Sequence, residues 1–146
     1  YGQGELQVTP LQAALVVATV ANDGLMMRPY LVERILDPEG HVLYQAQPTP
    51  LAVPIGVRTA RTLQQMMVAV VEHGAGRWWK PIEGVRVGGK TGSAETGTGA
   101  SHAWFLAFAP ADAPRYAVAV VVEHGGSGSE TAAPIAREVL NAALQR

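Results

Sequence analysis

The stretch Lys90-Thr91-Gly92-Ser93-Ala94-Glu95 decides the fold of this chain, because it closes a run of strand-forming residues that begins at Val85. The run from Val85 to Glu95 predicts one β-strand. Successive side chains of a strand point to opposite faces, so we expect Lys90 beside Gly88 and Gly92 on one face, and Thr91 with Ser93 on the other. The glycines leave room for a ligand or another backbone to approach the amine. An ammonium group next to a hydroxyl is a suitable receptor for a carboxylate.

The same region also satisfies the phosphate-loop pattern G-x-x-x-x-G-K-[ST], over Gly84 to Thr91. A phosphate loop joins a buried strand to the first turn of a helix, whose free N–H groups hold the anion. The preceding residues, Trp78 to Glu83, do not resemble a buried strand, and the following residues, Gly92 to Gly99, do not favour a helix. A nucleotide-binding loop is therefore kept only as a remote alternative to the strand.

Two helices are predicted upstream of this strand. Thr9-Pro10-Leu11-Gln12 has the capping-box pattern with proline at the first helical position, so a helix is expected to begin there. Asn22-Asp23-Gly24 ends this helix, and its apolar residues predict that it is mostly buried. Apolar residues at steps of three and four from Val57 to Val71 predict a second, amphipathic helix that ends at Gly74.

A hairpin is predicted between these helices. Its strands are Tyr30 to Leu36 and His41 to Tyr44, and its turn is Asp37 to Gly40. The prolines from Pro48 to Pro54 predict an extended connector with little regular structure. Residues Gly74 to Pro81, after the second helix, are predicted to form a loop.

The C-terminal half has the pattern of an antiparallel meander. Its strands are expected over Val85 to Glu95, Trp104 to Ala109 and Tyr116 to Glu123, with short connections between them. A loop over Gly125 to Ser129 and a helix beginning at Pro134 complete the chain. Helices packed on an antiparallel sheet define an α+β fold.

The composition narrows the function classes. The 146 residues include 11 Lys plus Arg and 12 Asp plus Glu, a formal net charge of −1 with histidine neutral. Proteins that bind nucleic acid or a membrane surface rely on a basic excess concentrated on one face, so this near-neutral balance argues against both classes. With 48% hydrophobic and 16% charged residues the chain is too apolar for disorder. Its longest apolar stretch, Ala13 to Ala21, is shorter than the ~20 residues of a membrane-spanning helix. There is no cysteine, and the spacing of His41, His73, His102 and His124 fits no metal motif, so no metal or other cofactor is expected.

The K-T-G-S-A-E stretch resembles the K-T-G-[ST]-A-E motif of penicillin-binding protein transpeptidases, a family of serine acyltransferases related to the β-lactamases. Other segments resemble the same family and occur in the same order, covering essentially the whole chain. They are Gly2-Gln3-Gly4, Thr9-Pro10-Leu11-Gln12, Asn22-Asp23-Gly24, Met27 to Tyr30, Val71 to Arg77, His102 to Phe105 and Ala109-Pro110. Their order fits the class B, monofunctional type best. The resemblance implies an incomplete β-lactamase/transpeptidase-like fold and a peptidoglycan D,D-transpeptidase.

The nucleophile motif of that family is not found in the sequence. The serines are Ser93, Ser101, Ser127 and Ser129, and none has lysine three residues later, so S-x-x-K does not occur. S-x-N does not occur either, and in the family's order both motifs precede K-T-G. Because the chain also begins without methionine, we expect residues 1–146 to be the C-terminal portion of a single transpeptidase domain, inactive alone.

The resemblance assigns roles to four residues of the strand. Lys90 would position the proton-transfer network and add positive potential, and Thr91 would bind the carboxylate of the substrate or of penicillin. Gly92 would keep the strand close to the helix that carries the nucleophile. The N–H of Ser93 would form half of the oxyanion hole and its C=O would receive a substrate amide, as an edge strand can do for an extended peptide. Lys90 and Ser93 are thus the expected catalytic residues.

The resemblance also implies partners and a location. The partners are peptidoglycan stem peptides that end in D-Ala-D-Ala, β-lactam antibiotics, the missing N-terminal half of the domain, and divisome or elongation proteins, but no nucleic acid. The location is the outer face of the bacterial cytoplasmic membrane, where an N-terminal helix would anchor the parent protein. The strand from Tyr116 to Glu123 would lack its neighbours, so we expect a homodimer, a swapped assembly or association with the missing half. A β-lactam sensor or inactive penicillin-binding scaffold is the alternative function.

Overall fold

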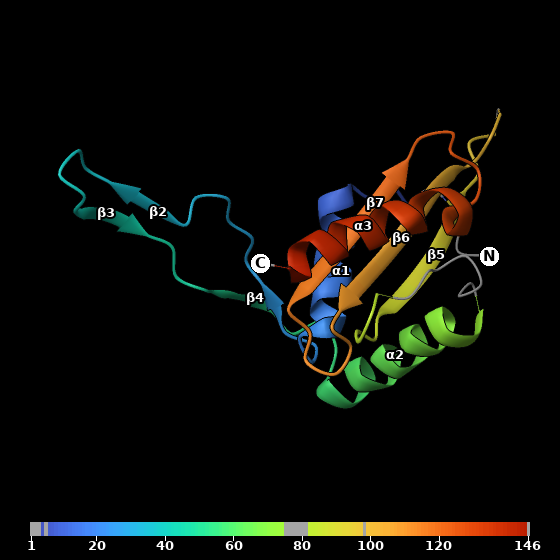
Figure 1. Cartoon of the computed structure of the whole chain (residues 1–146), viewed down its shortest axis with the longest axis horizontal. Helices are drawn as coiled ribbons and strands as arrows, with labels where there is room; N and C mark the ends of the chain where they lie inside the picture. The colour runs from blue at the N-terminus through green and yellow to red at the C-terminus, as the bar shows by residue number, and fades with distance from the viewer. Residues whose placement is uncertain (1–3, 5, 75–81, 98, 146) are drawn as a thin grey trace.

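A three-stranded antiparallel sheet with helices on both faces forms the body of the molecule, and a thin two-stranded arm projects from it (Figure 1). The computed structural model describes residues 4, 6–74, 82–97 and 99–145. In chain order the elements are α1 (Pro10–Ala21), β1 (Met26–Met27), β2 (Arg34–Leu36), β3 (Val42–Gln45), β4 (Pro50–Ala52), α2 (Val57–Ala69), η1 (Val70–Gly74), β5 (Gly88–Ala94), β6 (His102–Ala109), β7 (Tyr116–Val122), η3 (Gly128–Ala132) and α3 (Ala133–Leu144). The predicted α+β class is confirmed.

The sheet has the order β5-β6-β7, so the predicted meander is confirmed. The cross-strand partners include Lys90 with Leu106 and Ser93 with Ala103. The prediction that the first strand begins at Val85 is wrong, because β5 begins at Gly88. The N–H of Val85 donates instead to the carbonyl of Ile82 at 3.0 Å, which closes a short turn before the strand.

The core lies between the sheet and α3. Phe105 of β6 is 2% exposed and Leu140 of α3 is 1% exposed, and they belong to one buried cluster. The remaining members on these two surfaces are mostly alanines that are at most 2% exposed: Ala103, Ala107, Ala109, Ala132, Ala133 and Ala136. Such small side chains allow the helix to approach the sheet closely.

The helix α1 covers the opposite face of the sheet, behind β6 and β7 in the view of Figure 1. The predicted capping box is confirmed: the Thr9 hydroxyl accepts from the N–H of Gln12 at 3.2 Å, and the Gln12 amide oxygen accepts from the N–H of Thr9 at 2.8 Å. The prediction that α1 is mostly buried is wrong. Val17 and Val20 are buried, but Leu11 and Val16 are exposed, because no described element covers that side of the helix.

Helix α2 runs from Val57 and continues as the π-helical turn η1, so the predicted helix and its end at Gly74 are confirmed. The loop predicted over Gly74 to Pro81 lies, after its first residue, outside the described residues. The loop predicted over Gly125 to Ser129 is only partly correct, because Gly128 already begins the π-helical turn η3. Within the described residues, no helix is long and apolar enough to cross a membrane.

The arm consists of two short antiparallel pairs, β1 with β4 and β2 with β3. The predicted hairpin is confirmed, with β2 and β3 shorter than the predicted strands. Its turn is held by the Asp37 carboxylate, which accepts from the N–H groups of Glu39 at 3.0 Å and His41 at 2.7 Å. The prediction that the proline-rich connector has little regular structure is wrong in part, because Pro50–Ala52 pairs with β1. Every residue of β2 and β3 is exposed.

Candidate active-site strand

Strand β5 is at one edge of the sheet and presents its charged residue to solvent. Among the described strands only β6 pairs with β5, so the other edge is open. The Lys90 side chain is exposed, and its ammonium donates to the carbonyl of Thr91 at 2.7 Å. A ligand on this edge would therefore meet a positive charge that is held close to the backbone of the strand.

A groove of about 540 Å³ runs along this strand. From β5 it is lined by Lys90, Thr91, Gly92, Ala94, and from the following residue, Glu95. Its other walls come from β6, from α1 and from the N-terminal segment, through His102, Trp104, Leu106, Ala13, Gly4, Leu6, Gln7 and Val8. The N-terminal residues thus meet the β5–β6 pair, far from them in sequence, at the K-T-G residues.

The predicted alternation along the strand agrees only in part with this lining, because Thr91, expected on the opposite face, also lines the groove and Gly88 does not. Lys90 is paired across the sheet with Leu106 and Gly92 with Trp104, and all four residues line the groove. Three of the four predicted site residues, Lys90, Thr91 and Gly92, are thus brought together. Ser93 is exposed on the same strand but does not line the groove, so the structure does not bring its side chain together with the other three.

Close packing explains the first two glycines of β5. A Cβ atom on Gly88 would overlap the ring of Phe108, and one on Gly89 would lie 2.6 Å from the Phe105 ring. A Cβ atom on Gly128 of η3 would overlap the carbonyl oxygens of Gly92 and Trp104. The K-T-G strand is therefore fixed from behind by direct backbone contact with η3.

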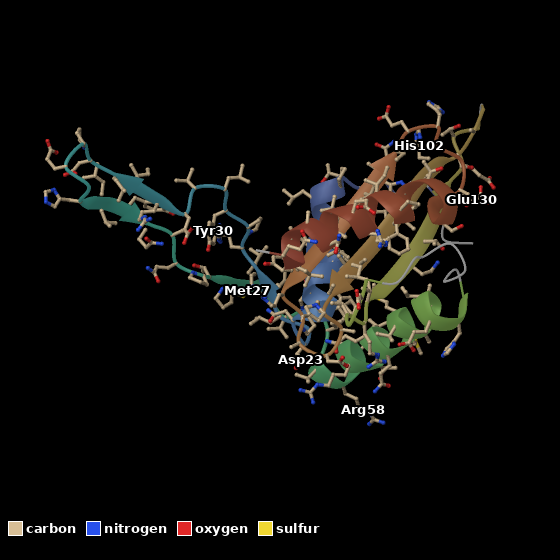
Figure 2. The ribbon with its side chains drawn as sticks, in the orientation of Figure 1. Asp23, Met27, Tyr30, Arg58, His102 and Glu130 are labelled. Atoms are coloured by element: carbon tan, nitrogen blue, oxygen red, sulfur yellow. The ribbon has the colours of Figure 1, made fainter. Side chains whose placement is uncertain are left out.

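A histidine pair lies at the far end of the groove. The Nδ1 of His102 accepts from the N–H of His124 at 3.0 Å, and the two rings meet edge to face with centroids 4.9 Å apart. The sequence predicts His102 at the rim of the cleft or simply exposed, and in the structure His102 lines the groove beside β5. Figure 2 labels His102 at the upper end of the sheet. The sequence gives no signal for the wall formed by Leu6, Gln7 and Val8.

Ion pairs hold the surrounding elements together. Arg86, just before β5, donates to Glu72 at 3.1 Å and to Asp112 at 2.8 Å. Arg61 of α2 makes a two-point contact with Asp23 after α1, at 2.9 and 3.2 Å. The hydrogen bond between Arg61 and Asp23 lowers the pKa of the Asp23 carboxyl and, together with the Asp23 charge, raises the pKa of Arg61. These contacts fix α2 relative to α1 and β5.

One cluster among the described residues has metal-ligand atoms close together. Asp37, Glu39 and His41 at the tip of the arm place one such atom each within 4.8 Å of the others. The Asp37 carboxylate already accepts from the two backbone N–H groups of the turn and lies 2.8 Å from the His41 Nδ1. The arrangement is explained by the hairpin turn.

The phosphate-loop alternative is wrong. Lys90 and Thr91 lie inside strand β5, which continues to Ala94, whereas a phosphate loop would place them at the first turn of a helix. The remaining explanation is the strand that resembles the transpeptidase motif. A family model described as the penicillin-binding protein transpeptidase domain matches residues 1–141. This chain belongs to the penicillin-binding protein transpeptidase family.

Named relatives agree with this family assignment. The chain is 43% identical to the peptidoglycan D,D-transpeptidase PbpA of Mycolicibacterium smegmatis, an alignment that covers 99% of this chain and 31% of that protein. It is 33% identical to the peptidoglycan D,D-transpeptidase MrdA of Haemophilus influenzae, over 96% of this chain and 24% of that protein. The chain therefore spans about a third or less of the length of these penicillin-binding relatives.

Solved structures of penicillin-binding proteins share the fold. Penicillin-binding protein A of Mycobacterium tuberculosis, in an imipenem acyl-enzyme complex, is 40% identical, with a TM-score of 0.89 over 98% of this chain and 32% of that one. PBP2 of Pseudomonas aeruginosa is 35% identical, with a TM-score of 0.78 over 99% of this chain and 31% of that one. The described helices, sheet and arm thus correspond to one contiguous part of larger penicillin-binding proteins.

Proposed function

We propose that this chain is the C-terminal portion of a class B transpeptidase domain, and that it supplies one wall of a peptidoglycan D,D-transpeptidase active site. The observation that carries the proposal is the open edge of β5, where Lys90, Thr91 and Gly92 line a groove in a chain that matches the family over residues 1–141. The named relatives are D,D-transpeptidases, and the penicillin-binding protein A structure holds imipenem as an acyl-enzyme. Stem peptides and β-lactams are accordingly the proposed ligands.

The chemistry is acyl transfer through a serine of an S-x-x-K motif, which does not occur in these 146 residues. The serine oxygen attacks the carbonyl of the D-Ala-D-Ala bond, its proton passes to the departing amine, and D-alanine leaves. An amine of a neighbouring stem peptide then attacks the ester, and the serine regains a proton. The bond between the two stem peptides replaces the bond that was cleaved.

The residues of β5 bind the substrate and stabilise the negative charge that develops on its carbonyl oxygen. The ammonium of Lys90 positions the proton-transfer network and adds positive potential, and the Thr91 hydroxyl donates to the substrate carboxylate. Gly92 keeps the strand close to the helix that carries the nucleophile, since on the groove side a Cβ atom there would meet only the Cβ of Trp104, at 3.2 Å. The N–H of Ser93 stabilises the oxyanion, and a donor in such a position contributes typically ~2.7–4 kcal/mol to acyl transfer.

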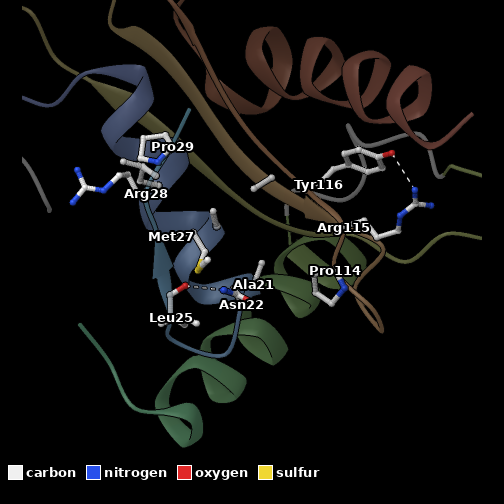
Figure 3. Close-up of a pocket in the computed structure, with 12 residues that line it drawn as sticks. Ala21, Asn22, Leu25, Met27, Arg28, Pro29, Pro114, Arg115 and Tyr116 are labelled. Carbon is white, nitrogen blue, oxygen red and sulfur yellow. Dashed lines mark hydrogen bonds between the residues drawn. The ribbon is translucent and has the colours of Figure 1, made fainter. Parts of the chain in front are cut away.

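The rest of the domain is proposed to cover the side of the body where α1 and β7 are exposed. Among the described strands β7 pairs only with β6. Helix α1 packs against β7, and its residues Leu11 and Val16 are exposed. A pocket of about 390 Å³ opens between the end of α1, β1 and the start of β7, with Arg28 and Arg115 at its rim (Figure 3). Covering this side would bury apolar surface and extend the sheet.

The proposed location and protein partners follow from the same assignment. A D,D-transpeptidase works on peptidoglycan, so we place the parent protein at the outer face of the cytoplasmic membrane, held by an N-terminal helix. Divisome or elongation proteins are its proposed partners. A β-lactam sensor or inactive penicillin-binding scaffold is the second candidate.

A chimera tests the proposal. In Mycolicibacterium smegmatis PbpA, the segment that aligns with this chain is replaced by residues 1–146, and acylation by a fluorescent penicillin is followed over time. We expect acylation of the chimera and none of the isolated chain. Lys90→Ala should slow acylation, and Ser93→Pro, which removes the proposed oxyanion N–H, should slow it about 100-fold or more.

The matched control is Ser101→Ala, a serine outside the groove, which should acylate at the parent rate. A folded chimera that penicillin does not acylate would overturn the proposal. Acylation without cross-linking of stem peptides would favour the sensor instead.

A further inference from the structure

A second hollow lies on the arm, away from β5. It has a volume of about 290 Å³ and is lined by Arg28, Tyr30, Tyr44, Gln45, Ala46, Gln47 and Thr49. Figure 2 shows Tyr30 part-way along the arm, between the β1–β4 pair and the β2–β3 pair. The site proposed for acyl transfer uses none of these residues.

The hollow exists because the ladder of the arm is interrupted. The N–H of Arg28 donates to the carbonyl of Thr49 at 2.8 Å, and the N–H of Ala46 donates to the carbonyl of Glu33 at 2.8 Å. Between these two bonds, residues 29–32 form no described strand opposite residues 47–48. Ala46, at 6% exposed, forms the floor of the opening.

The walls combine aromatic rings with unused hydrogen-bonding groups. Tyr30 and Tyr44 are 49% and 48% exposed, so each has a large ring area facing solvent. Within the described part of the chain, the side chains of Arg28, Gln45 and Gln47 make no hydrogen bond to protein. Tyrosine offers an apolar face with a polar tip, and an amide offers both a donor and an acceptor.

This combination favours a ring-shaped ligand with an apolar face and many polar groups. A sugar ring has that character: its C–H face packs on an aromatic ring while its hydroxyl and acetamido groups bond to amides. The volume of about 290 Å³ is just below the usual range of small-ligand sites, about 300–1,000 Å³, and so suits one or two sugar rings better than a folded partner. The Arg28 guanidinium is a donor suited to an acetamido carbonyl oxygen.

We propose that the arm hollow binds an N-acetylated saccharide, and that it serves as a glycan subsite for the strand whose stem peptides the β5 groove receives. The inference rests on the proposed function, since that function brings N-acetylated glycan to this protein. Its role is to align the glycan strand, and the chemistry at β5 does not require it. Binding is expected to be weak, with a Kd of about 1 mM, which corresponds to about −4 kcal/mol.

Titration of the full chain with an N-acetylglucosamine tetramer, followed by NMR, tests this site. We expect chemical shift changes at Arg28, Tyr30, Tyr44 and Gln47, and a several-fold weaker response to a glucose tetramer, which lacks the acetamido groups. Tyr30→Ala and Tyr44→Ala should each weaken binding about fivefold or more, because ring stacking is lost. Leu43→Ala is the matched control, since Leu43 lies beside Tyr44 on β3 and is 68% exposed but does not line the hollow.

Each outcome decides the proposal. Tyr30→Phe keeps the ring and should retain most of the affinity, which separates loss of the ring from loss of the arm's structure. Equal binding by the parent chain and both alanine variants would overturn the proposal, as would no binding of the tetramer. If the chimera is still acylated by penicillin in that case, the proposed transpeptidase function stands and only the glycan subsite fails.

Discussion

Gly128 is the single residue on which the position of the K-T-G strand most directly depends. A methyl group there would overlap the carbonyl oxygens of Gly92 and Trp104, and backbone atoms cannot rotate away as a side-chain end can. We predict that Gly128→Ala lowers the free energy of unfolding by about 1–3 kcal/mol, as overpacking typically does. In the chimera it should also slow acylation, because η3 is pushed away from β5.

Urea unfolding of the purified chain measures the first effect. Gly4→Ala is the matched control, because no heavy atom lies within 4 Å of a Cβ built at Gly4 and its φ is ordinary. Equal urea midpoints for Gly128→Ala and Gly4→Ala would show that η3 accommodates the added methyl group without loss of stability, and would contradict the prediction.

The Asp23–Arg61 pair makes stability depend on pH. Because Arg61 lowers the folded-state pKa of Asp23, the pair stabilises the fold above the ordinary carboxyl pKa of about 3.9, and this contribution is lost as the pH falls through the lowered value. We predict that Asp23→Asn lowers the urea midpoint at pH 6–7 and that the difference from the parent shrinks in acid. Asparagine tolerates the φ of +52° at this position, so backbone strain does not confuse the result.

A substitution of Arg61, the partner of Asp23, checks that the ion pair causes the pH dependence. Arg61→Gln removes the hydrogen bond that lowers the Asp23 pKa, so it should reduce the pH dependence in the same range. A midpoint difference for Asp23→Asn that is as large at pH 3 as at pH 7 would contradict the ion-pair explanation.

At the scale of elements, α1 depends on its first turn. The Thr9 hydroxyl satisfies the N–H of Gln12, which otherwise has no partner within the helix. We predict that Thr9→Ala lowers the free energy of unfolding by about 1 kcal/mol. Thr62→Ala is the matched control: Thr62 is in the exposed interior of α2, its hydroxyl bonds the Arg58 carbonyl, and alanine there should be neutral or stabilising. Equal losses for the two would rule out the cap as the cause.

Many of the helices, strands and turns were predictable because the sequence patterns that define them are local. The capping box, the hairpin turn at Asp37, the ends of α2 and the strand around Lys90 each depend on residues close in sequence. The pairing of Met26–Met27 with Pro50–Ala52 was not predictable, since it joins residues far apart with little alternation. The start of β5 at Gly88 also depends on a contact outside the strand pattern, the Val85–Ile82 turn.

The candidate site was predictable from its motif, but only as far as the motif extends. Lys90, Thr91 and Gly92 were identified because their spacing is fixed by the strand. The wall formed by Leu6, Gln7 and Val8 depends on how the N-terminal segment crosses the sheet, which no local pattern encodes. The exposed side of α1 was missed for the same reason, since burial depends on what lies opposite a helix.

At the scale of the whole molecule, the open edge of β7 predicts self-association of the isolated chain. An edge strand exposes backbone groups that can pair with another copy, and lysine on such an edge discourages pairing. We predict that the chain sediments as a dimer or larger species at high concentration, and that Ala117→Lys shifts it toward monomer. Ala113→Lys introduces the same charge in the exposed β6–β7 loop and should leave the association unchanged. A parent chain that is monomeric at all concentrations would contradict this prediction.

The alanine-lined contact between β6 and α3 limits how this molecule can evolve. Both surfaces already carry nearly the smallest side chain available, and the members of the contact are at most 2% exposed. Any single enlargement there would push the sheet and the helix apart, with a typical cost of about 1–3 kcal/mol, a large share of the stability of a small domain. Natural variants that reshape the groove by one substitution are therefore expected on the open edge of β5 and along its rim. Changes at the contact between β6 and α3 require compensating substitutions on both surfaces at once.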